Sequence, residues 1–129
     1  MANQREKMNE ALRETYWRGK GTQQQVLLEF VAREDQTVFS RYQLDKREME
    51  GPLEYCLHGG STQLPAVELS FRVPGHQRWD HLAWIYINEE GDLVVSRGLE
   101  VHMFEKIDKR LFIDLLVETW WNETAPTLT

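Results

Sequence analysis

The sequence predicts an α+β fold, a single domain in which a curved, mainly antiparallel sheet carries an N-terminal and a C-terminal helix packed on it. The chain has 129 residues and no internal repeat, and this length is close to the commonest size of one domain. Its apolar residues recur with helical spacing near both termini and alternate, as in strands, between them. We therefore expect one domain over residues 1–122, with a sheet of about five strands in the order α-β-β-(α)-β-β-β-α, and a flexible tail over residues 123–129.

The N-terminal segment has the pattern of an amphipathic helix over residues 4–17. Its apolar side chains recur at every fourth position, at Met8, Leu12 and Tyr16. Asn3, followed three residues later by Glu6, has the spacing of a capping box at the start of a helix. Because glycine commonly ends a helix, Gly19 and Gly21 are expected to stop this one.

Two segments rich in β-branched and aromatic residues, 26–32 and 37–44, predict the first two strands. The residues between them, 33–36, have a suitable length for the loop of an antiparallel hairpin. Asp45 and Glu48 then repeat the capping spacing. This spacing predicts a short helical stretch that continues through residues 53–57.

The second half of the chain predicts further strands and a last helix. Residues 67–73 alternate between apolar and polar, as in a half-buried strand, whereas residues 82–87 are apolar on both faces, as in a central strand. Residues 93–104 are expected to form one long strand with a bulge at Gly98. Asp108 can cap the last helix, residues 109–121, whose apolar residues occupy most of its circumference.

Charge and cysteine content narrow the function classes. The formal net charge is −6, so the mean field of the chain repels nucleic acids and anionic membranes, and a neutral or basic protein is the better partner. The single cysteine, Cys56, cannot form an internal disulfide, and no apolar run resembles a leader or reaches the length of about 20 residues of a membrane helix. We therefore expect a cytoplasmic protein.

The stretch 75–88, GHQRWDHLAWIYIN, contains the best candidates for metal ligands, which are His76, Asp80 and His81. Two imidazoles and a carboxylate could bind zinc or iron if they converged on one ion. Neighbouring residues on a strand point to opposite faces, so Asp80 and His81 are not expected to reach the same ion. The sequence therefore predicts no metal and no cofactor.

Two other patterns suggest a catalytic pair and a nucleic-acid surface. Cys56 and His58 could act as nucleophile and base, but residues two apart on the helix expected there do not face each other, so no catalytic residue is predicted. A basic and aromatic segment could stack on nucleic-acid bases, although basic side chains around a helix end explain it more simply. It consists of Arg13, Tyr16, Trp17, Arg18 and Lys20.

The surplus of aromatic residues is the strongest indication of function, because the chain has five tryptophans. Trp84 lies in the doubly apolar strand and is expected in the core. The other large aromatic side chains are expected at a surface that binds a partner or a second copy of the chain. These residues are Trp120, Trp121, Trp79 and Tyr86.

The sequence therefore favours a non-enzymatic module that binds another protein, as an adaptor, chaperone or inhibitor, and that forms a homodimer. The apolar last helix and the doubly apolar strand are the reasons for this expectation. The alternative is a small-molecule-binding protein or small enzyme, in which the curved sheet and last helix enclose an aromatic-lined cavity. His81, His102 or Asp80 would then lie at the mouth of that cavity.

Overall fold

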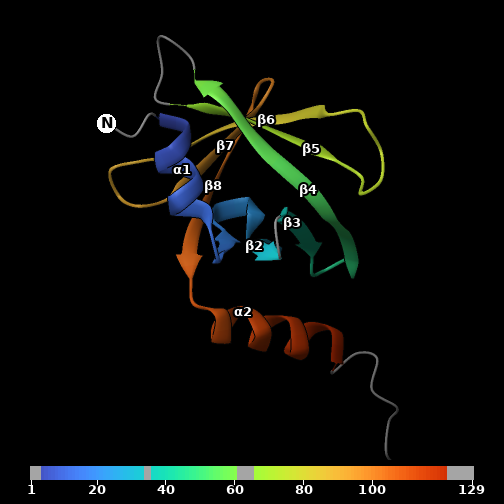
Figure 1. Cartoon of the computed structure of the whole chain (residues 1–129). Helices are drawn as coiled ribbons and strands as arrows, with labels where there is room; N and C mark the ends of the chain where they lie inside the picture. The colour runs from blue at the N-terminus through green and yellow to red at the C-terminus, as the bar shows by residue number, and fades with distance from the viewer. Residues whose placement is uncertain (1–3, 34–35, 61–65, 122–129) are drawn as a thin grey trace, which may run out of the picture.

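The computed structural model describes residues 4–33, 36–60 and 66–121 and shows a closed barrel of eight antiparallel strands, each paired with the next in sequence (Figure 1). The predicted α+β class, with an open sheet of about five strands, is therefore wrong. The strands are β1 (Thr15–Gly19), β2 (Val26–Arg33), β3 (Gln36–Gln43), β4 (Glu48–Gly60), β5 (Val67–Arg72), β6 (Asp80–Ile87), β7 (Leu93–Arg97) and β8 (Glu100–Ile107). The helices are α1 (Gln4–Leu12), the 3-10 turn η1 (Gly21–Gln23), α2 (Lys109–Leu116) and the π-helical turn η2 (Val117–Trp121).

Strand β1 closes the barrel and replaces the second half of the predicted N-terminal helix. The helix ends at Leu12, and Glu14 takes a left-handed backbone conformation with φ of 55° before the strand begins. Strand β1 pairs with β2 on one side and with β8 on the other. These pairings satisfy the backbone groups of two strands that would otherwise be sheet edges, so tertiary pairing overrides the helical spacing.

Strand β4 replaces the predicted helical stretch after Asp45. Its inward side chains, Leu53, Tyr55 and Leu57, are buried and alternate with Glu54, Cys56 and His58, which lie on the other face of the strand. The register against β3 shifts between Phe39 and Arg41, which lie opposite the part of β4 that contains Pro52. A proline is tolerated at such an irregularity because its missing N–H group would not join a regular ladder.

Gly98 forms a hairpin turn and not the predicted bulge. Strands β7 and β8 pair antiparallel up to Arg97 and Glu100, which leaves only Gly98 and Leu99 as the loop. Gly98 has a φ of 61°, the conformation that the tight turns of two-residue hairpins require. The predicted long strand is therefore two strands.

The hairpin of β2 and β3 is confirmed, as are the strands at β5 and β6. Strand β6 is not covered on both sides as predicted, because Ala83 and Ile85 are buried in the barrel interior whereas Trp84 faces out and is 36% exposed.

The interior of the barrel is filled at one end, which α1 covers (Figure 1). Met8 and Leu12 of α1 join the main core cluster together with Trp17 of β1, which is 1% exposed. Eight strands enclose a space just wide enough for side chains or for one small ligand. Here this end of the space is occupied by side chains, which leaves the other end for a ligand.

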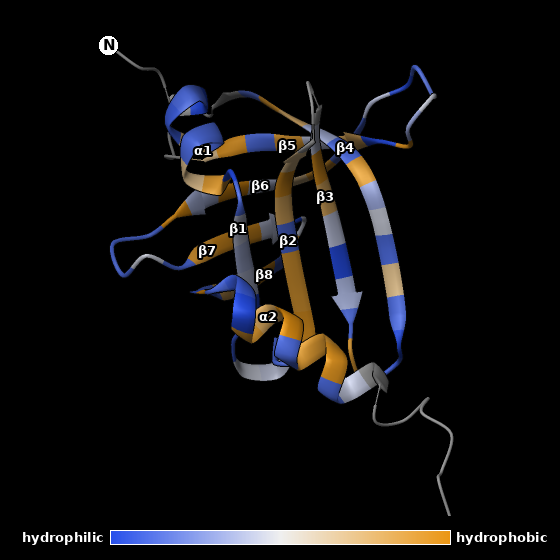
Figure 2. Cartoon of the chain, turned by 60° about the horizontal axis from the view of Figure 1, so that its bottom comes forward, coloured by the Kyte–Doolittle hydropathy of each residue, from blue (hydrophilic) through white to orange (hydrophobic). Residues whose placement is uncertain are grey.

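Helix α2 packs on the outside of the barrel across β1 and β2 (Figure 2). As the sequence predicts, Asp108 caps it, because its Oδ1 accepts a hydrogen bond of 2.7 Å from the backbone N–H of Leu111. Phe112 is buried in a second apolar cluster with Tyr16 of β1 and Tyr42 of β3. The predicted tail, residues 123–129, lies outside the described residues.

No helix in the described part of the chain is both long enough and apolar enough to cross a membrane.

Candidate functional site

A cavity of about 410 Å³ opens at the end of the barrel opposite α1. Side chains from strands β2 to β8 and from η1 line it, so residues far apart in sequence surround one space. Its volume lies within the range of about 300–1,000 Å³ that is typical of small-molecule sites. The cavity is therefore the leading candidate for a functional site.

The floor of this cavity is apolar and tightly packed. The floor side chains come from the main core cluster, and two of them, Phe30 and Ile85, are 1% and 0% exposed. Because the floor is so well buried, the open volume lies above it, towards the barrel mouth, and does not extend down to α1. The floor consists of Leu28, Phe30, Phe39, Leu69, Ile85 and Phe104.

The rim of the cavity is charged. It carries three permanent cations, a histidine and two carboxylates, which are Arg41, Lys46, Arg97, His102, Glu50 and Glu100. The Nε2 atom of His102 lies 3.5 Å from a carboxylate oxygen of Glu100. With His102 neutral the rim has an excess of one positive charge, although the whole chain has a net charge of −6. The rim is thus positive against the background of the protein.

Of the three cations, Arg41 adjoins the apolar floor, because it is the next inward-facing residue on β3 after Phe39. It is partly buried, and its Nη2 atom donates a hydrogen bond of 3.0 Å to Oε1 of Gln43. A guanidinium has five N–H donors, so most of its donor capacity is left for other partners.

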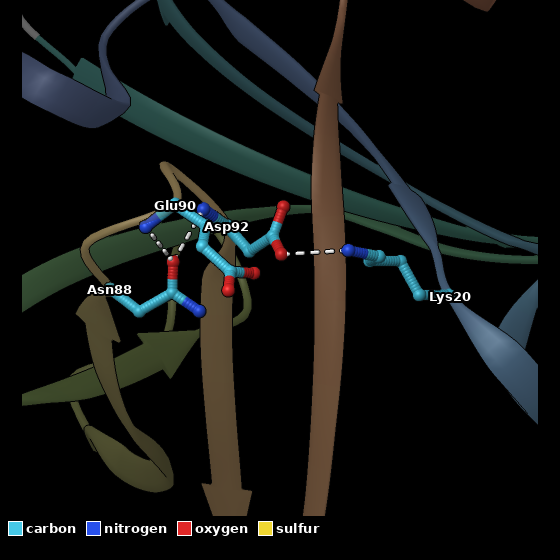
Figure 3. A network of polar contacts seen from close by, with 4 residues as sticks. All are labelled: Lys20, Asn88, Glu90 and Asp92. Atoms are coloured by element: carbon cyan, nitrogen blue, oxygen red, sulfur yellow. Dashed lines mark hydrogen bonds and ion pairs between the residues drawn. The ribbon is translucent and has the colours of Figure 1, made fainter.

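The η1 turn forms one side of the rim through Thr22 and Gln23. It can lie close to the end of β1 because Gly19 has no side chain: a Cβ atom there would be 1.9 Å from the carbonyl oxygen of Gln23. Lys20, between β1 and η1, binds Asp92 with an Nζ–Oδ2 distance of 2.8 Å (Figure 3). This hydrogen bond raises the pKa of Lys20.

The same network fixes the turn between β6 and β7. The side-chain Oδ1 of Asn88 accepts hydrogen bonds from the backbone N–H groups of Glu90 and Asp92, at 3.0 and 2.9 Å (Figure 3). Lys20 therefore ties the segment leading into the rim to an ordered turn.

A second hollow, of about 560 Å³, lies between α1 and strands β2 to β4. Its α1 side consists of exposed residues of both charge signs, including Arg5, Arg13 and Glu10. Burial raises the pKa of Tyr55, which also lines it, to about 12. This hollow is larger than the barrel cavity, but its exposed and charge-balanced wall selects for no ligand class.

Cys56 and His58 face each other, contrary to the sequence expectation. Because this segment is a strand and not a helix, residues two apart share a face, and the Sγ–Nε2 distance is 3.2 Å. Burial raises the pKa of the Cys56 thiol, so the reactive thiolate is disfavoured. The pair has the geometry of a nucleophile and base without the activation that such a pair needs.

The predicted metal candidates do not converge. Asp80 forms an ion pair with Arg78 at 3.0 Å, whereas Nδ1 of His81 lies 3.0 Å from Oε1 of Glu68. His76 is exposed in the turn before β6. Within the described residues no group of three or more His, Cys, Asp or Glu side chains could hold a metal ion. Of the three residues expected at a cavity mouth, only His102 lines the cavity.

The aromatic residues occupy other places than expected. Trp84 is 36% exposed on the outside of β6, so its predicted place in the core is wrong. Trp79 is also exposed, and its ring lies 4.5 Å from the guanidinium carbon of Arg72. Tyr86 is partly buried. The side chains of Trp120 and Trp121 lie outside the described part of the chain.

The basic and aromatic segment near the N-terminus is dispersed by the strand that it forms. Trp17 points into the barrel core, whereas Tyr16 belongs to the outer cluster under α2. Lys20 is bound to Asp92, and Arg13 lines the hollow beside α1. These side chains therefore form no common surface.

The sequence interpretation missed Arg41, Lys46 and Arg97. Arg41 carried a local signal, because Phe39, Arg41 and Gln43 occupy alternate positions of a correctly predicted strand and so share a face. No local pattern indicates that this face would lie inside a barrel.

Comparison of the chain with protein-family models, with curated proteins and with solved structures finds no match.

Proposed function

We propose that this protein binds a small molecule with an apolar part in the cavity at the open end of its barrel. The observation that carries the proposal is the cavity of about 410 Å³ whose floor is apolar and whose rim carries several polar and charged groups. Ligand sites combine these features because apolar walls supply affinity and a few placed polar groups fix orientation. The ligand's apolar part would lie on the floor and its polar part at the rim.

The division of the barrel into two halves supports this proposal. Side chains from α1 and the strands fill the closed half, and this core supplies the stability that an open cavity at the other end does not. The cavity walls are strands of a closed barrel, so they are held rigidly and a ligand need not order them on binding. We place this function in the cytoplasm, because the one cysteine of the chain is a free thiol.

The proposal predicts that the neutral fluorescent probe phenylnaphthylamine binds in the cavity. It also predicts that substitutions that fill the cavity weaken this binding. Val95 lines the cavity and is partly buried, so Val95→Trp should fill part of the space and weaken probe binding by about tenfold or more. The measurement is a titration in which the probe is excited directly, with near-ultraviolet circular dichroism to check that the variant is folded.

The matched control is Val73→Trp, which places the same side chain at an exposed position outside the residues that line the cavity. It should leave probe affinity unchanged. Equal affinity of the wild type and Val95→Trp would mean that the probe binds elsewhere and would overturn the proposal. Leu82→Trp, at another lining position, repeats the test if Val95→Trp does not fold.

We propose self-association through the outer face of β6, β7 and β8 as a second candidate function. Cross-strand pairing places two rows of uncharged residues side by side on this face: Tyr86, Val94 and Met103, and Trp84, Ser96 and Val101. Val101 is 61% exposed. A second copy is the favoured occupant because two chains of net charge −6 repel each other least where neither presents a charge.

This second candidate predicts a dimer at micromolar concentration that Val101→Glu converts to a monomer. The new carboxylate would be buried without a partner in the interface, which is costly. Light scattering after size-exclusion chromatography measures the mass. Val73→Glu, at an exposed apolar position outside the two rows, is the control and should leave the mass unchanged. A monomeric wild type would exclude this candidate.

A further inference from the structure

We infer that the ligand of the barrel cavity is an amphipathic organic acid whose carboxylate is held by Arg41, with Lys46 and Arg97 adding to the attraction at the rim. This inference rests on the proposed function, because it assigns a chemical class to the molecule bound in the cavity. Two observations support this assignment: the contacts that the three cations make and their positions around the cavity.

Arg41 is placed to bind an anion directly. It is partly buried among cavity-lining residues, and within the described residues its side chain donates a hydrogen bond to Gln43, a neutral partner. Among the described residues no carboxylate forms an ion pair with it, although Glu50 occupies the facing position on β4. A guanidinium withdrawn from water without a carboxylate partner costs free energy that a bound anion would recover.

The other two cations extend this positive region. Lys46 and Arg97 also line the cavity, and neither forms an ion pair with a carboxylate in the part of the chain that the structure describes. By contrast, Glu100 contacts His102 at 3.5 Å, so one of the two rim carboxylates is already engaged with another group. An approaching anion therefore meets three cations that no carboxylate among the described residues neutralises by contact.

The geometry of arginine narrows the class of anion. A planar guanidinium matches a planar carboxylate through two parallel hydrogen bonds, which a lysine ammonium does not form. The floor behind Arg41 begins with Phe39 on the same strand, so a molecule held at the guanidinium has its remaining part over apolar side chains. An acid with an aliphatic or aromatic body satisfies both regions, whereas an inorganic anion satisfies only the rim.

Two pairs of molecules, each with a similar apolar body and with only one anionic member, test this inference. The fluorescent probe anilinonaphthalene sulfonate is the anionic relative of neutral phenylnaphthylamine, and decanoate and decanol are an acid and an alcohol with the same chain length. We expect the wild type to bind the anionic probe, and decanoate to displace phenylnaphthylamine at lower concentration than decanol does. The titrations use the full chain.

Arg41→Met removes the guanidinium and keeps an unbranched apolar stem. It should weaken binding of decanoate and of the anionic probe by about 10- to 100-fold, because hydrogen bonds to charged groups contribute that much. Its affinity for phenylnaphthylamine should change by less than about threefold, since no interaction with charge is lost. Arg97→Met, at an exposed rim position, should weaken binding of the two anions by only about two- to fivefold.

Lys7→Met is the matched control, because it removes an exposed positive charge from α1, at the other end of the barrel. It should leave all affinities unchanged. If Arg41→Met weakens binding of the anionic and the neutral molecules equally, or changes neither affinity, the assignment of an acid is wrong. The proposal that the cavity binds a small molecule would still stand. If the wild type binds none of the four molecules in the cavity, the proposed function fails and the inference fails with it.

Discussion

Replacing Trp17 with alanine should lower the free energy of unfolding by about 3–5 kcal/mol, the usual cost of truncating a large buried aromatic side chain. Trp17 is 1% exposed and belongs to the cluster that fills the closed half of the barrel. Its Nε1 also donates a hydrogen bond of 2.8 Å to Oγ1 of buried Thr15. The substitution would therefore leave both a cavity and a buried hydroxyl that lacks this bond. Denaturant unfolding followed by circular dichroism measures the effect.

Trp84→Ala is the control for this prediction, because Trp84 is 36% exposed on the outside of the barrel. It should cost less than about 1.5 kcal/mol. A second variant, Trp17→Phe, retains most of the apolar volume and should cost less than Trp17→Ala. Equal losses for Trp17→Ala and Trp84→Ala would contradict the placement of these two residues on opposite sides of the barrel wall.

Phe112→Ala should produce the second large loss of stability, again about 3–5 kcal/mol, because it truncates the most buried side chain of α2. The Phe112 ring centroid lies 4.8 Å from that of Tyr16 and 5.5 Å from that of Tyr42. Aromatic pairs at such distances contribute beyond the area that they bury. Removing the ring should also expose Leu27, which is fully buried beneath this cluster.

Hydrogen exchange distinguishes global destabilisation from local release of α2. If α2 only detaches, its amides lose protection while those of the barrel strands keep theirs. The matched control is Leu111→Ala, at the neighbouring exposed position, which should change stability by less than about 1 kcal/mol. Unchanged stability and unchanged exchange in Phe112→Ala would show that α2 does not depend on this contact.

Less of the candidate site than of the fold could be predicted from the sequence, because the site depends on how the strands are arranged in space. The alternation of Phe39, Arg41 and Gln43 was visible in a strand that the sequence predicts correctly. The significance of Arg41 was not visible, because a charged residue on a strand usually faces water. Only a structure in which this face turns inward makes the charge a feature of a cavity.

The error at Cys56 and His58 has the same origin in local geometry. Their separation of two positions excludes contact on a helix and brings the side chains together on a strand. The capping spacing of Asp45 and Glu48 favoured a helix there, but Leu53, Tyr55 and Leu57 occupy alternate positions and are buried on one face of a strand. Pairing with β3 and β5 decided between the two patterns.

The sequence by itself determined the features that depend on neighbouring residues. These are the start of α1, the β2–β3 hairpin, strands β5 and β6, and the cap of α2 at Asp108, each of which follows from alternation, turn length or a side-chain hydrogen bond. Only the tertiary structure decided that the sheet closes. Closure requires β1 to pair with β8, from opposite ends of the chain, and the free energy of that pairing comes from satisfying two open sheet edges at once. No local pattern contains that contribution, and the interior cavity exists only because of it.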